Sequence, residues 1–346
     1  MATPADPTPF VSLVVPTFRR AAILVHSLRA LLRLDYPRDR FEVLVVDDGS
    51  LDETQAEVAG LADPRIVFLQ QPANQGVASA RNRGAREARG EVLIFLDDDM
   101  LVQESMIDRH LRWLRRFGEC MVNGHWEFTP ELDADLRRTS FGRFRLEVEA
   151  WVKTGIAFRP LEGHLLEPAA VTACNLGMWR RDFERVGGFD ESFPHAGAED
   201  QEFSVRAKAA GIQFIYDPDL LLWHNDQRLT LKQFCERQRR GALTAALLAR
   251  KYPERSAKTR LLVENRPIQT GDSWRLVLKK LAKGLFSTPP VRGLAHLVAG
   301  LVSRVSPNAR ALRRLYWALC GAYIYLGFRE GLRRVPERAG GVHATG

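Results

Sequence analysis

Short apolar runs alternate with amphipathic stretches through the first third of the chain. The five consecutive apolar residues at 92–96, like the runs at 10–15 and 41–46, are too short for a buried helix and are typical of strands covered on both faces. The stretches at 21–34 and 76–89 have the apolar spacing of amphipathic helices. Repeated strand and helix units with short connections predict a parallel, doubly wound sheet with right-handed crossovers.

The pattern continues less evenly up to residue 226. Residues 129–167 are irregular, and we interpret them as a partly mobile, helical insertion. Around that insertion the apolar spacing predicts two helices and three strands, in the order helix 103–117, strand 120–128, helix 198–211, strand 213–216 and strand 220–224.

The last third of the chain is basic, and its sequence pattern predicts helices throughout. Four helices are predicted at 231–251, 273–285, 291–302 and 308–334, separated by prolines. Residues 228–346 contain 24 Lys/Arg and 6 Asp/Glu, so this part carries +18 and the part before it −10, although the whole chain carries only +8. A basic tail indicates an anionic partner, either a nucleic acid or the cytoplasmic face of a membrane. No nucleic acid is expected, because no known reading motif is present and the preceding part is acidic.

The longest uncharged apolar run of the tail, 315–328, would form a helix of ~21 Å, shorter than the ~30 Å hydrocarbon core of a bilayer. We therefore expect no crossing. Six arginines flank the run and would each contribute ~1 kcal/mol at an anionic leaflet, which favours a membrane surface. The alternative is that apolar residues such as Trp317 and Tyr323 pack the tail onto the rest of the protein. The sequence leaves both readings open.

Cysteine usage and the N-terminus favour the cytoplasm. The four cysteines are widely spaced with no CxxC pair, which argues for reduced thiols and against a disulfide framework or a thiolate zinc site. Residues 1–9 are polar, lack the apolar segment of a signal peptide and are predicted to be a disordered lead-in. With the basic tail, this suggests a cytoplasmic protein, peripheral at the inner face of the plasma membrane.

Two predicted strands end in carboxylates. Asp97, Asp98 and Asp99 follow the run at 92–96, and Asp48 lies just beyond the run at 41–46. Adjacent unit charges ~4 Å apart repel by ~4 kcal/mol at an effective dielectric constant of about 20, and a divalent cation would remove that cost. Ligands of open α/β sheets bind beyond the carboxyl ends of the strands, where these acids are expected. The alternative is a solvated, Asp-rich turn.

Predicted helix starts supply further polar residues. Ser50 and Glu53 have the spacing of a capping box, which predicts a helix ending at residue 61. Arg81 lies in the first turns of the helix at 76–89, and both helix N-termini and guanidinium groups favour phosphate. Glu199 and Asp200 begin the helix at 198–211. The ordinary alternatives are a solvated arginine and acids that complement the helix dipole.

Taken in order, these segments resemble the family-2 glycosyltransferases with the GT-A fold. The resemblance covers residues 10–226, and each motif is weak alone, whereas the set in this order is specific. The matching segments are Val-Ser-Leu-Val-Val-Pro-Thr-Phe-Arg at 11–19, Val-Val-Asp-Asp-Gly-Ser at 45–50, residues 74–84, Phe-Leu-Asp-Asp-Asp at 95–99, Gly-Gly-Phe-Asp-Glu at 187–191, Gly-Ala-Glu-Asp at 197–200 and Trp-His at 223–224.

The resemblance implies an α/β fold class, with a Rossmann-like, mostly parallel sheet flanked by helices and a C-terminal helical extension. The implied domains are a catalytic domain at 10–226, with a nucleotide-binding half at 10–100 and an acceptor half at 101–226, and a basic helical extension at 227–346.

The resemblance also implies a donor, a nucleotide-diphosphate sugar and most simply a UDP-sugar. Asp48 would accept from the base N–H of uracil, Pro16 and Thr17 would line the nucleotide pocket, and Arg81 would approach the base or diphosphate. Within a DxD-type motif formed by Asp97, Asp98 and Asp99, the first faces the ribose and the last binds the cation. His224 would complete the metal shell, although a lone histidine beside a tryptophan is more often structural. Carboxylates with one imidazole suit Mn²⁺ or Mg²⁺.

The implied reaction is a single displacement that inverts the anomeric centre. The cation stabilises the departing nucleoside diphosphate, and Asp200, with Glu199 beside it, acts as general base for an acceptor hydroxyl. Acids at a helix N-terminus are expected to stay ionised near pH 7. The expected acceptor is a glycan or lipid-linked glycan, as in the synthesis of cell-envelope polysaccharides.

Two departures and two rival readings matter. The QxxRW motif and the transmembrane helices of processive synthases are missing from this sequence, which favours transfer of one sugar. A sugar nucleotidyltransferase would need a Gly-rich, basic loop where this chain has Pro16-Thr-Phe-Arg-Arg20. A non-enzymatic protein would use only the basic tail, and nucleotide-sugar hydrolysis with Mn²⁺ would argue against it.

Overall fold

The computed structural model describes residues 8–154, 157–226, 229–257 and 259–334. The chain divides into two compact units, which we describe separately. The first comprises Met1–Asp190 and Glu199–Leu229, and the second Glu191–Ala198 and Thr230–Gly346. Of the lead-in predicted at 1–9, residues 1–7 lie outside the described residues. Residues 227–228, which follow the domain boundary predicted at 226, also lie outside them.

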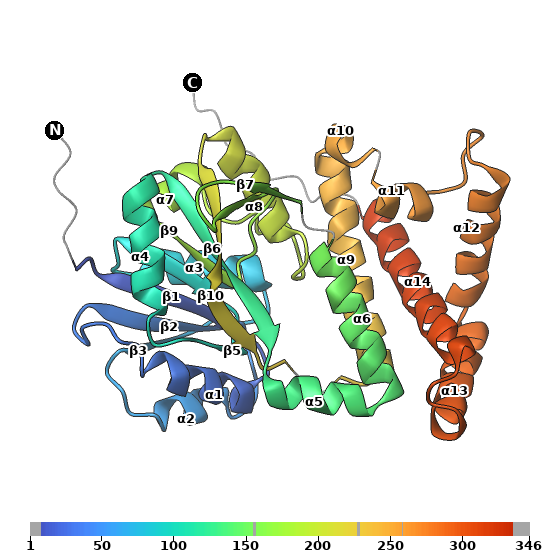
Figure 1. Ribbon diagram of the computed structural model, residues 1–346, viewed down its shortest axis with the longest axis horizontal. Coiled ribbons are helices and arrows are strands. Elements are labelled where there is room, and N and C mark those ends of the chain that lie inside the picture. The colour runs from blue at the N-terminus through green and yellow to red at the C-terminus, as the bar shows by residue number, and fades with distance from the viewer. Residues whose placement is uncertain (1–7, 155–156, 227–228, 258, 335–346) are drawn as a thin grey trace. The chain divides into compact units, whose positions relative to one another are not determined.

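Four parallel strands form one half of the sheet in the first unit (Figure 1). They are β1 (Val11–Thr17), β2 (Phe41–Asp47), β3 (Ile66–Gln70) and β4 (Val92–Leu96), in the order β3-β2-β1-β4. Thr17 lies opposite Asp47, so β1 and β2 end at the same edge of the sheet. The predicted parallel arrangement is confirmed, and the edge that carries the acids is the edge where such sheets bind ligands.

The other half of the sheet is mixed. Strand β9 (Asn175–Trp179) runs antiparallel between β4 and β6 (Cys120–Phe128), and β10 (Gln213–His224) runs parallel to β6. Three short strands pair antiparallel around β10: β5 (Met100–Leu101), β8 (Leu166–Pro168) and, beyond it, β7 (Phe158–Pro160).

One strand, β10, replaces the two short strands predicted at 213–216 and 220–224. Its pairing with β6 shifts register between Asp217 and Leu221, so the turn-like residues form a bulge rather than a break. The carboxylate of Asp217 stabilises that bulge by accepting from the indole N–H of Trp113, at 2.7 Å, and from the backbone N–H of Asp219, at 2.9 Å. The sheet strand therefore continues to His224 without interruption.

Helices cover both faces of the sheet, which explains the nearly continuous apolar runs. One face packs against α1 (Ala21–Leu31), α2 (Thr54–Ala59) and α4 (Met106–Phe117), and the other against α3 (Val77–Glu87), α7 (Arg180–Val186) and α8 (Glu199–Ala209). Successive residues of β4 alternate between the two cores: Ile94 lies in the first and Phe95 in the second, both fully buried.

The predicted capping box at Ser50 is wrong. Helix α2 begins only at Thr54, whose backbone N–H donates to Asp52 Oδ1 at 3.1 Å. The hydroxyl of Ser50 instead accepts from the backbone N–H of Arg19, at 2.8 Å, and so ties the end of β2 to the loop after β1. In the insertion, α5 (Pro130–Arg138) and α6 (Ser140–Thr154) confirm the predicted helical character.

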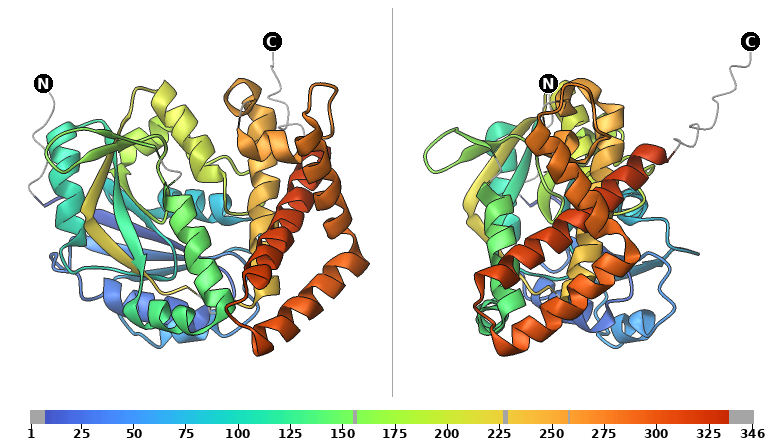
Figure 2. Two further views of the ribbon diagram at one scale, coloured as in Figure 1. Left: turned by 45° about the vertical axis from the view of Figure 1, so that its right-hand side comes forward. Right: turned by 90° about the vertical axis from the view of Figure 1, so that its right-hand side faces the viewer.

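The second unit is helical, and all four predicted helices are present in it. In chain order it contains α9 (Leu231–Lys251), α10 (Pro253–Ser256), α11 (Arg260–Asn265), α12 (Trp274–Ser287), α13 (Pro289–Val305) and α14 (Arg310–Arg333). Pro289 and Pro290 begin α13 rather than separating helices, as the first turn of a helix allows. Helix α14 packs along α9 and also contacts α12 and α13 (Figure 2).

The apolar run at 315–328 forms the core of this second unit. Its Leu319 and Tyr323 are buried in α14, the helix that packs along α9, so packing accounts for this run. Among the described helices, none is both long enough and apolar enough to cross a membrane.

Candidate active site

The carboxylates after β4 meet residues from the end of β1. Asp98 and Asp99 are buried, whereas the side chain of Asp97 is about one-third exposed. The hydroxyl of Thr17, at the end of β1, donates to Asp98 Oδ2 at 2.7 Å. The adjacent parallel strands thus bring Thr17 and the acidic triplet together, as the sequence predicted.

Arg20 lies among these carboxylates, and sequence reasoning missed it. Its guanidinium donates to Asp98 at 2.7 Å and to Asp99 at 2.5 Å, and lies 3.4 Å from Asp226. A single cation from the loop after β1 thus partly neutralises three buried acids. The only sequence signal was its position directly beyond the first strand.

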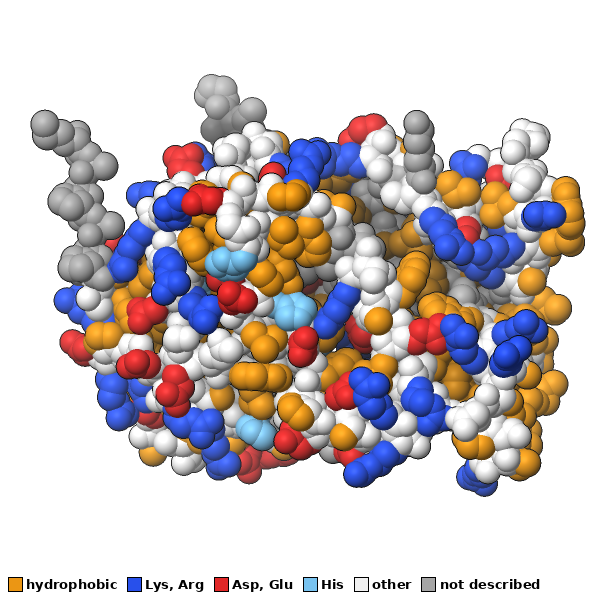
Figure 3. All heavy atoms as spheres, in the orientation of Figure 1, with side chains coloured by type: hydrophobic (Ala, Val, Ile, Leu, Met, Phe, Trp, Pro, Cys, Tyr) orange, Lys and Arg blue, Asp and Glu red, His pale blue; other side chains and the backbone are white. Residues whose placement is uncertain are grey.

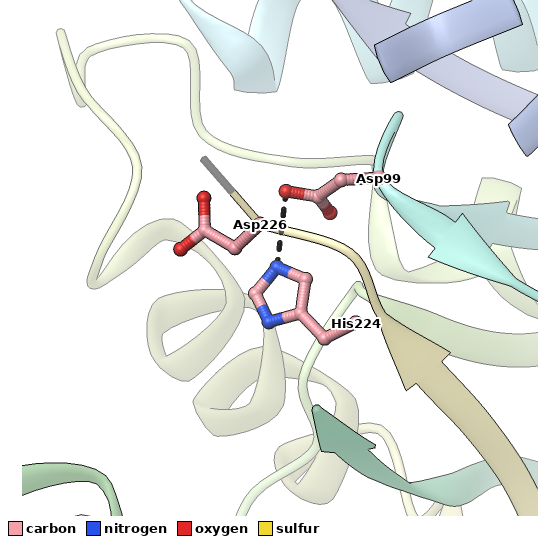
Figure 4. A group of neighbouring side chains, drawn as sticks. All are labelled: Asp99, His224 and Asp226. Atoms are coloured by element: carbon pink, nitrogen blue, oxygen red, sulfur yellow. Dashed lines mark ion pairs between the residues drawn. The ribbon is translucent and has the colours of Figure 1, made fainter. Parts of the chain in front are cut away.

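Three side chains form a group that could hold a metal ion (Figure 4). They are Asp99, His224 and Asp226, all buried, and their ligand atoms lie within 4.8 Å of one another. The imidazole Nε2 of His224 lies 3.0 Å from Asp99 Oδ2. The sequence predicted Asp99 and His224 as ligands, and the structure brings them together and adds Asp226.

The chemistry of this group fits a hard divalent cation. Asp99 Oδ1 and His224 Nδ1 are buried and have no hydrogen-bond partner among the described residues. A buried, unsatisfied carboxylate oxygen is costly, and coordination to a cation would satisfy it. Two carboxylates and one imidazole suit Mn²⁺ or Mg²⁺.

The charges around this group are unevenly balanced. Burial, and then the charge of Asp99, raises the pKa of Asp98 to about 7, although Arg20 opposes that shift. Burial alone would also raise the pKa of Asp99, but His224 and Arg20 outweigh it and lower that pKa. For His224, burial is outweighed by Asp99, which raises its pKa. Of Asp98 and Asp99, Asp99 is therefore the carboxylate that stays ionised, as a metal ligand must, whereas His224 has to lose its proton before it can bind a cation.

Asp226 is also held by Arg145, which contacts the carboxylate oxygen that Arg20 does not contact. This arginine comes from α6, its side chain is fully buried, and its guanidinium donates to Asp226 Oδ2. The guanidinium carbon of Arg145 lies over the ring of Phe128, 5.1 Å from the ring centroid. The insertion therefore contributes a buried charge to the candidate site, a role that its irregular sequence did not indicate.

Arg81 links the acidic triplet to the start of α8. One guanidinium nitrogen donates to Asp97 at 2.9 Å and the other to Glu199 at 2.8 Å. The side chain is only 4 % exposed. In this structure Arg81 therefore connects the predicted cation site with the predicted base, rather than presenting a free charge to a phosphate.

Asp200 begins α8 next to Glu199 and is partly exposed. Its Oδ1 accepts from the backbone N–H of Gln201 at 2.8 Å. Burial, and then the charge of Glu199, raises the pKa of Asp200 to about 7. The expectation that this acid is fully ionised at neutral pH is therefore wrong, because burial and a like charge outweigh the helix dipole. A base with a pKa near the working pH is well matched to proton transfer.

Asp48 organises the loop that precedes α3. Its carboxylate accepts from the side chain of Gln71 at 2.6 Å and from the backbone N–H groups of Gln75 and Gly76, at 2.7 and 2.9 Å. The next residue, Gly49, has φ = +78°, and a Cβ there would lie 2.6 Å from the backbone of Ala73. The two loops thus approach so closely that only glycine fits. Pro16 lies in β1 opposite Val46 of β2, two residues before Asp48 in the sequence.

A pocket of about 320 Å³ opens beside the candidate metal group. Asp226 contributes to its wall, so the group borders space that a small ligand can enter. The other lining residues are His26, Leu101, Thr129, Glu131, Leu132 and Asn225.

Replacing Arg20 with Gln is expected to destabilise the metal-free protein by roughly 3 kcal/mol, because Asp98, Asp99 and Asp226 lose their shared cation. Added Mn²⁺ should then raise the melting temperature of the variant more than that of the unaltered protein, since bound cation replaces the lost charge. Thermal unfolding in EDTA and across a Mn²⁺ series measures both effects. Arg19→Gln, at the exposed neighbouring arginine, is the matched control. Equal stability of the two variants in EDTA would contradict the assigned role of Arg20.

Comparison with known protein families agrees with this geometry. Residues 12–176 match the model of glycosyl transferase family 2, and residues 155–219 match that of the N-terminal domain of galactosyltransferase. Validoxylamine A glucosyltransferase of Streptomyces hygroscopicus subsp. jinggangensis is 34% identical over 224 residues, which cover 59% of this chain and 52% of that protein. Glycosyltransferase AglE of Haloferax volcanii is 34% identical over 123 residues, which cover 35% of this chain and 40% of that protein. The chain thus spans about half the length of the curated relatives it matches.

Solved structures share the fold at low sequence identity. The mannosyltransferase PcManGT of Pyrobaculum calidifontis, solved with GDP-Man and Mn²⁺, has a TM-score of 0.59 and 21% identity, covering 95% of this chain and 89% of that one. The structure of S. aureus TarS 1–349 with UDP-GlcNAc has a TM-score of 0.50 and 15% identity, and the match covers 93% of this chain and 90% of that one. These similarities support the GT-A fold.

Proposed function

We propose that this protein transfers a single sugar from a nucleotide-diphosphate sugar to an acceptor hydroxyl, with inversion. The proposal is supported by the match of residues 12–176 to the glycosyl transferase family 2 model and by the GT-A fold of the chain. The observation that carries the proposal is the link that Arg81 makes between the acids after β4 and the acids that begin α8. Asp99, His224 and Asp226 form the cation group, and Arg81 connects Asp97, two residues before Asp99, to Glu199, the neighbour of Asp200. A leaving-group site and a base site are thereby held in one framework.

The donor nucleotide is assigned to the loops after β1 and β2. Pro16, Thr17 and Asp48 lie at the ends of these strands, where open α/β sheets bind ligands. Asp48 holds two backbone N–H groups at the start of α3, which fixes the loop whose glycine begins that helix. A carboxylate there also suits the imide N–H of uracil, so the proposed donor is a UDP-sugar. Asp97 would face the ribose, and Arg81, which donates to both Asp97 and Glu199, would hold Asp97 in position rather than contact the diphosphate.

Asp99, His224 and Asp226 would hold Mn²⁺ or Mg²⁺, which when bound stabilises negative charge on the departing diphosphate. Asp98 contributes indirectly: it accepts from Thr17 and Arg20 and so fixes the end of β1 against the end of β4. Arg20 supplies a second positive charge at the same place. Its side chain is 23% exposed, so it can also reach a phosphate oxygen at the rim of the site.

Asp200 is proposed to take the proton of the acceptor hydroxyl while the acceptor oxygen attacks the anomeric carbon. Its pKa of about 7 lets it act as a base near neutral pH, and Glu199 keeps that pKa high. Because Glu199 is bound by Arg81, it is a positioning residue rather than a second base. The acceptor is proposed to be a glycan or lipid-linked glycan; RfbC of Myxococcus xanthus, an O-antigen biosynthesis protein, is 31% identical over 244 residues, 64% of this chain and 18% of that protein.

The test is a donor screen by thermal shift, followed by an assay of nucleotide release. UDP-, GDP- and dTDP-sugars are compared with and without Mn²⁺. We expect UDP-sugars to raise the melting temperature most, and only with the cation, and the best of them to be hydrolysed slowly to UDP. Stabilisation by GDP- or dTDP-sugars alone would correct the donor, and no cation-dependent stabilisation by any nucleotide sugar would refute the proposed function.

A further inference from the structure

Apolar side chains gather on the surface of two helices in the second unit. Among the described residues, more of the exposed large apolar side chains lie on α12 and α13 than on all other elements together. Figure 3 shows these side chains over α12 and α13, at the right of that view. Those that are more than half exposed are Trp274, Leu278, Leu281 and Leu285 on α12, and Leu294, Leu297, Leu301 and Val305 on α13.

On each helix these residues form one stripe. The spacing on α12 is i, i+4, i+7 and i+11, and on α13 it is i, i+3, i+7 and i+11. Residues at this spacing share one face of an α-helix. Both helices are therefore amphipathic, with the apolar face turned outward.

The most deeply buried residues of these helices are polar or small, the reverse of the usual pattern in water, and the apolar Leu276, Val277 and Phe286 of α12 are only half-buried. The buried residues of α12 are Lys280 and Ser287, and those of α13 are Ala295 and Ala299. The charge of Lys280 is paired with Asp272, and the hydroxyl of Ser287 lies 3.3 Å from the carbonyl oxygen of Ala322 in α14. A polar contact thus helps to attach α12 to α14, while Leu278, Leu281 and Leu285 stay outside.

Such a surface requires something to cover it. Each exposed leucine forgoes the transfer free energy that burial would give, and contiguous apolar surface of this kind marks an interaction site. The two stripes lie on consecutive helices that both contact α14, so one apolar partner can cover both.

The charge of the same segment identifies the partner. Residues 273–329 contain ten Lys/Arg and no Asp or Glu. Arg275, Arg304, Arg310 and Arg314 are exposed, and Arg304 follows Leu297 by seven residues, which places it on the apolar face of α13. Trp274 begins α12, and tryptophan is enriched where a protein meets the lipid headgroups.

We propose that α12 and α13 lie in the interface of an anionic lipid bilayer, with the leucine stripes among the acyl chains and the arginines at the headgroups. A second copy of this chain is disfavoured as occupant, because it would bring two acid-free, basic surfaces together. Nucleic acid is disfavoured because aliphatic stripes offer it neither stacking nor hydrogen bonds. The surface differs from the one expected from sequence, where the run at 315–328 was the candidate; that run is used for packing in α14.

The test is flotation of the full chain with vesicles of phosphatidylcholine alone and with added phosphatidylglycerol, at low and high salt. The unaltered protein should float with the anionic vesicles, less at high salt, and not with neutral ones. Leu281→Gln combined with Leu297→Gln should weaken partition at least ~10-fold, because each removes a side chain that enters the bilayer. Leu51→Gln, at an exposed leucine of the first unit, is the matched control and should bind as the unaltered protein does.

A second arm separates charge from apolar insertion. Arg304→Gln with Arg310→Gln should reduce binding to anionic vesicles and flatten its salt dependence. Circular dichroism and sedimentation are recorded for every variant. Absence of flotation with anionic vesicles, or flotation that the leucine variants do not change, would overturn the proposal. So would an oligomer that the leucine variants convert to monomer without vesicle binding, since the surface would then be a contact between copies.

Discussion

Replacing Asp99 with Asn is expected to lower nucleotide-sugar turnover by roughly 100- to 1,000-fold and to remove most of its dependence on Mn²⁺. Among the described residues, Asp99 Oδ1 is buried without a hydrogen-bond partner, and Asp226 and His224 lie beside Asp99. The pKa of Asp99 is lowered by His224 and Arg20 against the effect of burial. An amide at this position keeps the size of the side chain and removes its charge. The measurement is nucleotide release across a Mn²⁺ series at saturating donor.

The variant is expected to fold, because Arg20 still pairs with Asp98 and Asp226. Its control is Asp219→Asn. Asp219 belongs to the other group of described residues with metal-ligand geometry, His164, Asp217 and Asp219, and is largely exposed. Asp219→Asn should keep normal turnover and the normal response to Mn²⁺. Near-normal turnover of Asp99→Asn in EDTA would refute a cation at this site.

The parallel half of the fold was predictable because its strands are covered on both faces. Val92 to Leu96 in β4 are all buried, and such strands appear in sequence as short, unbroken apolar runs. The middle of β10 was harder to predict. Asp217, Pro218 and Asp219 are typical turn residues, but here a buried carboxylate bonds to Trp113 and turns the segment into a bulge within one strand. That contact joins residues 104 positions apart and has no local signature.

The candidate site was predictable where its residues follow strand ends. Thr17, Asp98 and Asp99 meet because β1 and β4 are neighbours and end at one edge. The residues that sequence reasoning missed, Arg20 and Arg145, act through pairing with distant acids. Arg20 lies 206 positions from Asp226, and Arg145 belongs to a helix with no recognisable motif. Such pairs follow from tertiary packing, which periodicity cannot supply.

Arg81 lies in the helix where the sequence placed it, but its partners are carboxylates rather than a phosphate. The helix start and the guanidinium group indicated phosphate binding. Because Arg81 is buried, however, its charge would be costly without a partner from the protein itself. The structure pairs it with Asp97 and Glu199, which joins two motifs separated by about a hundred residues. The same contact explains why Glu199 and Asp200, neighbours in sequence, have different environments: one is paired with Arg81, and the other keeps its carboxylate for the site.

Asp200→Asn is expected to bind the nucleotide sugar normally and to lose transfer by ~100-fold or more, the usual scale for a general base. The amide oxygen can still accept from the backbone N–H of Gln201, so the start of α8 is preserved. The loss should therefore appear in kcat, with little change in the donor Kd measured by thermal shift. An equal loss in donor affinity would make Asp200 a binding residue instead.

The pH dependence of transfer gives a sharper test of the same residue. Because a base acts when deprotonated and the pKa of Asp200 is raised to about 7, kcat should rise with pH through 7 and level off above it. Asp98, whose pKa is also about 7, would change cation affinity instead, so each rate is measured at saturating Mn²⁺. Glu199→Gln removes the like charge that raises the pKa of Asp200, and the rise should then move to lower pH. A rise that persists unchanged in both Asp200→Asn and Glu199→Gln would assign the proton transfer to another group.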